Sequence, residues 1–183
     1  RQSNHKILFL GELGRRKGCY DIPDVVKQVV ADIPDAKFIL AGAGSVQDEI
    51  AIKQMIKEKK VEKNVEFPGW VRGKEKDKLL READVFFLPS YNEGMPMSIL
   101  DAMGYGLPIV STNVGGISKI VQNGKNGYCI EPGNIIEMSE AIKTLIESKR
   151  IESSVLSFKI VKNGYSLEQH IKKLEKCYVE VLE

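Results

Sequence analysis

The residue types best suited to chemistry lie together in the segment Glu93-Gly94-Met95-Pro96-Met97-Ser98-Ile99-Leu100-Asp101. Pro96 suits the first turn of a helix, where its missing N–H costs nothing. The backbone N–H groups of Gly94, Met95 and Met97 are then free to face a ligand, and helix N-termini of this kind favour anions. Glu93 is either a further ligand contact or a capping residue of the turn.

Asp101 places a carboxylate on a helix whose neighbouring residues are apolar. A buried carboxylate without donors costs several kcal/mol, so this side chain needs partners. The two hydroxyls of a ribose diol would supply them. A backbone N–H or a basic side chain of the protein itself would serve equally well, and the sequence leaves both alternatives open.

A second loop with chemical potential is Gly11-Glu12-Leu13-Gly14-Arg15-Arg16-Lys17-Gly18. Its glycines allow tight turns. Three successive cations before a helix oppose the helix dipole unless an anion lies beside them. A phosphate group would remove that conflict, whereas the alternative is a basic turn exposed to water.

Weaker signals follow two other predicted strands. Gly42-Ala43-Gly44-Ser45 begins like a dinucleotide fingerprint, but Gln47 occupies the third glycine position and the ending of a P-loop is missing. A tight turn capped by Ser45 is the alternative interpretation. In the next loop we expect Val71 to be exposed at the lip of a base pocket and Trp70 to pack in the core.

Short β-branched and aromatic runs alternate with amphipathic stretches along the chain, which indicates an α/β fold. The expected strands are 6–13, 36–41, 65–71, 85–89, 108–112 and 128–131, and the expected helices are 20–33, 46–60, 74–83, 97–105, 135–150 and 166–182. Strands that are apolar throughout predict a Rossmann-like, doubly wound parallel sheet of about six strands with helices on both faces. Ligands bind such sheets at the carboxyl ends of the strands, where the loops above converge. A glycine turn at Gly115-Gly116 is expected at the same edge, with or without a ligand.

Composition excludes several classes of protein. No apolar run approaches the roughly 20 residues of a transmembrane helix. The 27 Lys and Arg nearly balance the 25 Asp and Glu, so we expect no nucleic-acid partner. Three distant cysteines and two histidines predict a reducing, cytoplasmic setting and no metal site.

Taken together, the loops resemble the donor-binding, C-terminal half of GT-B glycosyltransferases, in the large retaining group 1 (family 4) that includes sucrose, glycogen and lipopolysaccharide-building enzymes. The specific part runs from Glu93-Gly94-Met95-Pro96 to Asp101-Ala102-Met103, and is followed by Gly106-Leu107-Pro108 and Gly115-Gly116. This pattern is similar to the Glu-x7-Glu signature of that family. The similarity covers nearly the whole chain.

The resemblance implies a role for each matching residue. Lys17 would contact the donor diphosphate, and Glu93 would face hydroxyls of the transferred sugar, so these two form the implied catalytic pair. Asp101 would hold the ribose, and the loop from Val71 to Lys76 would lie beside the base. The implied donor-binding set is Gly11, Arg15, Arg16, Lys17, Gly42, Val71, Lys76, Glu93, Gly94, Met95, Pro96, Met97 and Asp101.

Two positions depart from the pattern of the family. Glu12 stands where many members carry an arginine that helps to neutralise the diphosphate, so Arg15 or Arg16 would have to replace it. Asp101 is one methylene shorter than the usual glutamate, which weakens its expected grip on the ribose.

The resemblance also implies what surrounds the chain. We expect residues 1–183 to form a single nucleotide-sugar-binding domain with a terminal helix at 166–183, and an N-terminal acceptor domain to be missing. The fragment would then bind a nucleotide sugar, with UDP-hexose as first choice, and would transfer nothing by itself. The implied acceptor is a glycan or a lipid-linked glycan in polysaccharide biosynthesis. The missing domain could bring the enzyme to the inner membrane face, and no metal or other cofactor is expected.

Functions of other classes remain as alternatives. A non-catalytic nucleotide-binding or interaction module would keep the fold and lose the donor. A dinucleotide-dependent oxidoreductase is disfavoured by the incomplete glycine fingerprint, and a sugar phosphorylase by the lack of a lysine suited to a pyridoxal Schiff base.

Overall fold

Six parallel strands form one sheet in the order β3-β2-β1-β4-β5-β6 within residues 4–182, which the computed structural model describes except for the side chains of 148–151, 181 and 182. The strands are β1 Lys6–Leu10, β2 Lys37–Ala41, β3 Val65–Gly69, β4 Val85–Leu88, β5 Ile109–Thr112 and β6 Gly127–Ile130. All five neighbouring pairs run parallel. The predicted fold class is therefore confirmed. The domain limits expected at 1–183 extend outside the described residues at both ends.

Burial follows the position of each strand in the sheet. All four residues of β4, at the centre, are buried, and so are the last four residues of β1. Strands covered on both faces read as continuous apolar runs, as these do. β3 lies at one edge, and its buried Val65 is followed by the exposed Glu66 and, two residues later, by the exposed Pro68.

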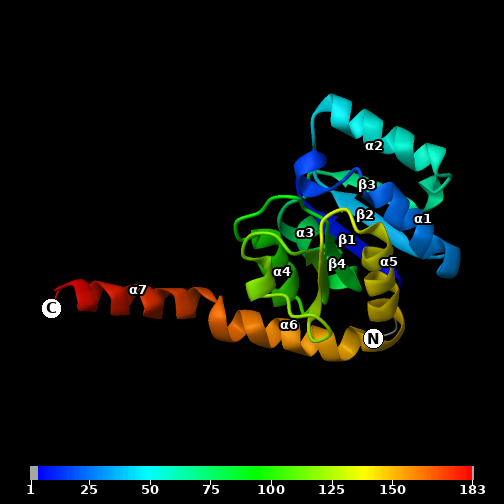
Figure 1. Ribbon diagram of the computed structural model, residues 1–183. Helices are drawn as coiled ribbons and strands as arrows, with labels where there is room; N and C mark the ends of the chain where they lie inside the picture. The colour runs from blue at the N-terminus through cyan, green and yellow to red at the C-terminus, as the bar shows by residue number, and fades with distance from the viewer. Residues whose placement is uncertain (1–3, 183) are drawn as a thin grey trace.

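Helices cover both faces of the sheet. They are α1 Ile22–Asp32, α2 Val46–Glu58, α3 Gly73–Glu82, α4 Met97–Gly104, α5 Ile135–Thr144, α6 Arg150–Gly164 and α7 Leu167–Leu182. Figure 1 shows α3 and α4 on one side of the sheet and α1 and α5 on the other. α1 packs against α5, and α6 packs against α4.

The turn into α2 forms as predicted. Ser45 is the N-cap, and its Oγ accepts a hydrogen bond of 3.1 Å from the N–H of Asp48. Capping of this kind satisfies one of the free N–H groups of the first helical turn. The Gly42–Ser45 segment is therefore explained in part by the local needs of a helix.

The chain after α5 differs from the expectation. The expected helix 135–150 ends at Thr144 and passes through a π-helical turn, Leu145–Lys149, into α6, which was not predicted. The apolar residues of α6, among them Val155, Leu156, Phe158, Ile160 and Val161, do not repeat on one face of the helix. The spacing of apolar residues therefore does not predict a helix here. The segment also contains no proline, so nothing in it prevents a helix from forming.

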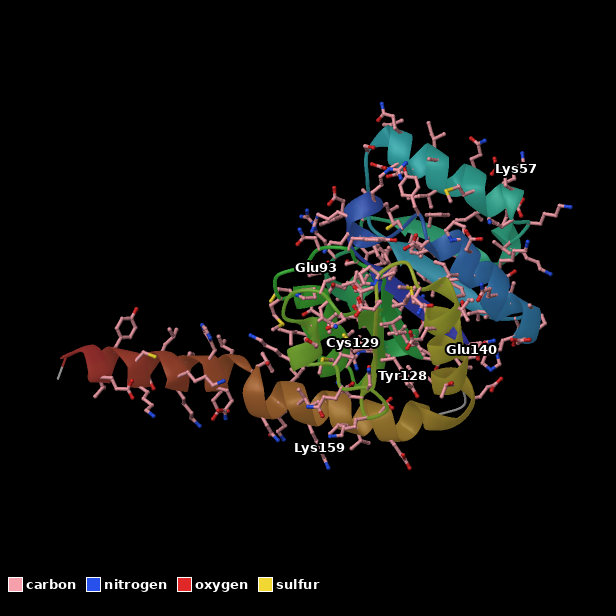
Figure 2. The ribbon with its side chains drawn as sticks, viewed as in Figure 1. Lys57, Glu93, Tyr128, Cys129, Glu140 and Lys159 are labelled. Atoms are coloured by element: carbon pink, nitrogen blue, oxygen red, sulfur yellow. The ribbon has the colours of Figure 1, made fainter. Side chains whose placement is uncertain are left out.

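The last helix, α7, extends away from the rest of the molecule (Figures 1 and 2). Among the described elements its main contacts are with α6. Its exposed apolar side chains include Leu167, Ile171, Leu174 and Tyr178. No helix in the described part of the chain is long and apolar enough to cross a bilayer.

Candidate functional site

A cavity of about 570 Å³ opens at the carboxyl ends of the central strands. It lies where the strand order reverses between β1 and β4, the usual binding position in a doubly wound sheet. Its lining comes from the ends of β1 and β2, from the loops after β1, β2, β3 and β4, and from α3 and α4. The lining residues are Leu10, Gly11, Glu12, Arg16, Lys17, Ala41, Gly42, Trp70, Val71, Arg72, Gly73, Lys76, Pro96, Met97, Ser98 and Asp101.

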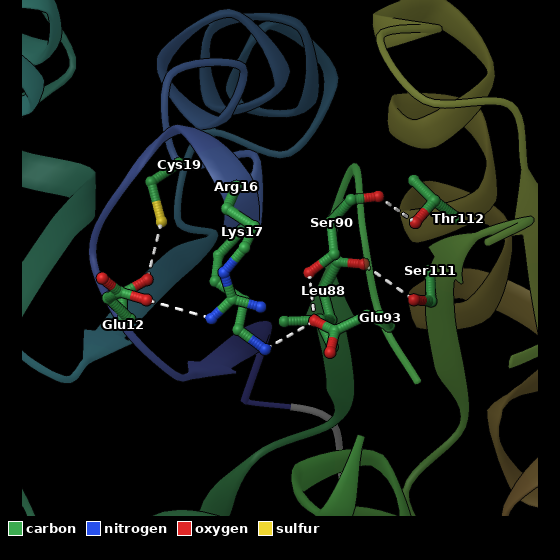
Figure 3. Close-up of polar contacts among 9 residues, drawn as sticks. All are labelled: Glu12, Arg16, Lys17, Cys19, Leu88, Ser90, Glu93, Ser111 and Thr112. Carbon is green, nitrogen blue, oxygen red and sulfur yellow. Dashed lines mark hydrogen bonds and ion pairs between the residues drawn. The ribbon is translucent and has the colours of Figure 1, made fainter. Parts of the chain in front are cut away.

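The loops after β1 and β4 meet in an ion pair. Lys17 ends a short 3₁₀ turn, Arg15–Lys17, and its Nζ lies 2.5 Å from Oε1 of Glu93. The side chains of Lys17 and Glu93 are only 13% and 6% exposed. Ser90 Oγ donates a second hydrogen bond to the same carboxylate oxygen, at 2.6 Å (Figure 3). The sequence therefore places a lysine and a glutamate, 76 residues apart, at one point beside the cavity.

Hydrogen bonds from β5 hold the Glu93 loop. The hydroxyl of Ser111 donates to the carbonyl of Leu88 at 2.7 Å, and Thr112 Oγ1 donates to the carbonyl of Ser90 (Figure 3). All three of Ser90, Ser111 and Thr112 are buried. Buried polar groups need such partners, so the loop is fixed by the same bonds that satisfy its backbone.

The glycine turn after β5 closes on the Glu93 loop from the other side. Gly116 N–H donates to the carbonyl of Gly94 at 2.7 Å. Gly115 has a φ of +55°, and a Cβ built on it would lie 2.0 Å from the carbonyl oxygen of Glu93. Only glycine fits at this position. The expected glycine turn thus supports the site by close backbone packing.

The cations of the β1 loop do not all face the cavity. Arg16 lines it, but Nη2 of Arg16 already lies 3.0 Å from Oε2 of Glu12. Arg15 does not line the cavity, and its guanidinium lies 4.1 Å from the centre of the Tyr20 ring. Glu12, the departure noted in the sequence, therefore pairs with the arginine that was expected to replace the missing one.

Cys19 lies buried behind this loop. Its Sγ donates to the carbonyl of Glu12 at 3.5 Å. Burial raises the pKa of the thiol to about 12, so it stays protonated at neutral pH. Such a thiol packs as an apolar group and supplies no nucleophile.

The carboxylate of Asp101 accepts a hydrogen bond from a lysine of the protein itself. Its Oδ2 lies 2.6 Å from Nζ of Lys76, the fourth residue of α3. Both side chains line the cavity and are partly exposed, at 39% and 35%. Asp101 itself is thus half-buried and not fully buried, contrary to the expectation from the sequence. Of the two alternatives, the basic side chain partners the carboxylate here, and a ligand hydroxyl would have to share or replace that contact.

The expected environments of Trp70 and Val71 are reversed in the structure. Trp70 is 62% exposed and Val71 is 9% exposed, and both line the cavity. β3 ends at Gly69 with a φ of +79°, two residues before the expected end. That turn ends the alternation of inward and outward side chains along the strand. Trp70 therefore points outward and Val71 inward, the reverse of the expectation. The guanidinium of Arg72 lies 5.8 Å from the centre of the Trp70 ring.

Only some of the remaining expected residues line the cavity. Gly11, Gly42, Pro96 and Met97 line it. Gly94 and Met95 do not, although in the described part of the chain their N–H groups donate no hydrogen bond. Of the other lining residues, Arg72 and Gly73 fall within the loop from Val71 to Lys76 that was expected beside the base. The expected binding residues did not include Leu10, Glu12, Ala41, Trp70 and Ser98. Ser98 precedes Asp101 by three residues on α4, and helical spacing could have placed both on one face.

A larger groove of about 1310 Å³ lies elsewhere, between α3, the turn before β5, and α6. It includes Asp84, whose carboxylate accepts hydrogen bonds from the N–H groups of Asn4, before β1, and of Lys6, the first residue of β1. The groove is therefore at the amino ends of the strands, away from the converging loops. Volume alone does not make it the functional site. Among residues 4–182, no three His, Cys, Asp or Glu side chains are grouped to hold a metal ion.

Comparisons with known proteins show to which family the chain belongs. The family described as glycosyl transferases group 1 matches residues 1–166. An Escherichia coli relative, UDP-Gal:alpha-D-GlcNAc-diphosphoundecaprenol alpha-1,3-galactosyltransferase, is 28% identical over 178 residues, which are 95% of this chain and 45% of that enzyme. The chain thus spans about half the length, or less, of the curated relatives it matches.

Solved structures share the fold. TarM of S. aureus superposes with a TM-score of 0.85 at 27% identity, over 96% of this chain and 35% of that one. The C-terminal domain of LpcC, a group 1 glycosyl transferase family protein from Francisella tularensis, gives a TM-score of 0.81 at 20% identity and covers 91% of this chain and 88% of that one. The chain belongs to the glycosyl transferases group 1 family, and its fold is that of the C-terminal, donor-binding domain of GT-B glycosyltransferases.

Proposed function

We propose that this chain binds a nucleoside diphosphate sugar, UDP-hexose by preference, as the donor half of a retaining glycosyltransferase. The observation that carries the proposal is the contact between Lys17 and Glu93, at one end of a cavity that also holds Asp101. Two reported relatives support the choice of donor. The E. coli relative is named for UDP-Gal, and TarM was solved in complex with UDP.

The diphosphate would lie between Lys17 and the start of α4. The Lys17 ammonium has three donors and gives one to Glu93, so donors remain for phosphate oxygens. The N–H groups of Gly94 and Met95, which donate no hydrogen bond within the described residues, and the N-terminus of α4 add further positive potential. The ribose would then reach Asp101, and Glu93 would accept hydrogen bonds from hydroxyls of the sugar.

The reaction proposed is breakage of the bond between the anomeric carbon and the diphosphate oxygen. The bonding electrons leave with the diphosphate, the anomeric carbon becomes oxocarbenium-like, and an acceptor hydroxyl then adds there and loses its proton. Lys17 and Arg16 would stabilise the departing charge in a preorganised site. The proposal requires no metal, because these cations take that role. Retention of configuration follows from the family resemblance.

The complete enzyme would act on a glycan or lipid-linked acceptor held by an N-terminal domain. The E. coli relative is named for a diphosphoundecaprenol-linked acceptor, which supports a lipid-linked one. On this proposal the 183-residue chain binds the donor and is inactive in transfer. We further propose a cytoplasmic location, where nucleotide sugars are available to such an enzyme.

A thermal-shift panel tests the proposal. UDP, GDP and ADP, and the corresponding hexose derivatives, are added to the chain in turn, and stabilisation of about 2.7 kcal/mol is expected for a ligand at 100 times its Kd. The UDP compounds should raise the melting temperature most. A panel in which none of them raises it would rule out donor binding.

Calorimetry with two variants assigns the ends of the site. Lys17→Ala should weaken UDP binding by about 1.5 to 3 kcal/mol, the worth of a hydrogen bond to a charged group. Asp101→Asn should weaken binding of UDP more than binding of pyrophosphate, which has no ribose. Equal losses for both ligands would remove Asp101 from the ribose site.

One observation favours a second candidate, a non-catalytic module of the same fold. Arg16 and Asp101 already have partners in Glu12 and Lys76, so part of the site is satisfied without a ligand. Failure of every nucleotide in the panel, together with an intact fold, would favour this candidate.

A further inference from the structure

The Trp70 side chain is exposed at a position where the fold does not require it. It lies in the turn between β3 and α3, is 62% exposed, and lines the cavity. Its neighbour Val71 supplies the buried apolar contact of that turn. Tryptophan is among the costliest side chains to leave in water, because its large apolar area gains most from burial. A ligand that covers the ring would recover that free energy.

The cavity changes character from one end to the other. Lys17 lies in the loop after β1, the Lys76–Asp101 pair joins α3 to α4, and Trp70 lies in the loop after the edge strand β3. One strand, β2, separates β3 from β1, which is a displacement of roughly 10 Å at the usual strand spacing. A cation, a carboxylate and an aromatic ring around one cavity suit the diphosphate, the ribose and the base of a nucleotide.

The surroundings of the ring also suit a flat π-system. Arg72 holds its guanidinium 5.8 Å from the ring centre, and both residues line the cavity. A cation at this distance is attracted to the ring face. Gly73, with a φ of +50° and no atom near a Cβ position, leaves space next to the pair.

We propose that Trp70 is the stacking platform for the base of the donor nucleotide. The inference rests on the proposed function and adds a residue to it. Stacking is tolerant of base identity because every base has a π-face. Trp70 therefore contributes affinity for a nucleoside without choosing between uracil, guanine and adenine, and selection of the base must come from hydrogen bonds elsewhere in the loop.

The chain offers a direct test because Trp70 is its only tryptophan. UDP, uridine and pyrophosphate are titrated into the chain while tryptophan fluorescence is followed, and calorimetry measures binding in parallel. We expect UDP to quench the fluorescence with the same Kd that calorimetry gives. Pyrophosphate should bind calorimetrically and leave the fluorescence nearly unchanged, because it carries no base.

Two variants at the position complete the test. Trp70→Ala should weaken UDP binding by roughly 5- to 150-fold, the range for loss of one base–aromatic stack, and should leave pyrophosphate binding unchanged. Trp70→Phe should retain most of the affinity for UDP. Tyr178→Ala is the matched control, because Tyr178 is an equally exposed aromatic on α7, outside the cavity.

The outcomes separate this inference from the function on which it rests. The stacking role is overturned, and donor binding is left intact, if UDP binds Trp70→Ala and the parent chain with the same Kd in calorimetry and does not quench the fluorescence of the parent chain. An equal loss of UDP and pyrophosphate binding in Trp70→Ala also overturns it, since the ring would then support the whole site. If no nucleotide binds the parent chain, both the proposed function and this inference fall.

Discussion

Replacement of Lys17 by methionine should destabilise the chain as well as the site. The substitution keeps most of the length of the side chain and removes its charge. The Glu93 carboxylate, only 6% exposed, is then left without its ammonium partner. Loss of one partner from a buried pair costs about 3–5 kcal/mol. The Ser90 hydroxyl, at 2.6 Å, still donates and offsets about 1 kcal/mol. We therefore expect the free energy of unfolding to fall by about 2–4 kcal/mol.

The double variant Lys17→Met/Glu93→Gln separates stability from binding. It leaves no unpaired buried charge, so most of the lost stability should return, and the coupling between the two sites should be about 1–3 kcal/mol. Pyrophosphate binding should nevertheless remain weak, because no ammonium faces the phosphate. Urea unfolding followed by circular dichroism measures the first effect, and calorimetry measures the second.

Lys172→Met provides the control for an exposed ion pair. Lys172 pairs with Glu168 at 2.7 Å on α7, with both side chains more than half exposed, and its loss should change stability by less than about 1 kcal/mol. A Lys17→Met variant as stable as this control would refute the claim that the pair at the site is held out of water. A double variant that binds pyrophosphate like the parent chain would exclude Lys17 as the phosphate ligand.

Three further predictions concern the loops around the site. Gly115→Ala should destabilise the chain more than the matched control Gly124→Ala, since both glycines have a left-handed backbone but only at Gly115 would a Cβ lie 2.0 Å from the neighbouring loop. In urea unfolding the control should cost about 1–2 kcal/mol and Gly115→Ala at least twice as much, and Gly115→Ala should also weaken UDP binding. Equal costs for the two variants would contradict the close packing. Glu12→Gln should free the arginine beside it and tighten pyrophosphate binding roughly twofold to tenfold in calorimetry, and weaker binding would show that Glu12 assists the site. Iodoacetamide at neutral pH should modify the exposed Cys177 and spare Cys19, whose pKa of about 12 keeps it protonated until the pH approaches that value. Mass spectrometry measures the modification, and a modified Cys19 would contradict its burial.

Most of the fold could be predicted from local patterns. The six strands and the helices between them could be predicted from apolar runs and from apolar residues at helical spacing, because these apolar residues form the buried face of each element. α6 could not be predicted in this way, since its apolar residues are spread around the helix. It forms as the continuation of α5 through the π-helical turn and packs on α4, which are facts of the tertiary structure.

The site was predictable as a set of loops and less so as a set of contacts. That Lys17 and Glu93 meet follows from strand order, because parallel strands bring the loops after β1 and β4 to one edge. Which donor would partner Asp101 depended on the reach of Lys76 from another helix, and no spacing in the sequence encodes it. The environment of Trp70 depended on the residue at which β3 ends.

The proline in β3 has a consequence for how the protein behaves at high concentration. β3 is a border strand, with β2 on one side only, and the carbonyl of Gly69 points to β2. Backbone groups alternate in direction along a strand, so Pro68 occupies the adjoining outward position, where it has no N–H to offer. A second copy of the chain cannot continue the sheet there without leaving an acceptor unmatched. The exposed carboxylate of Glu66 adds charge to the same margin, and together they protect it against strand-by-strand aggregation.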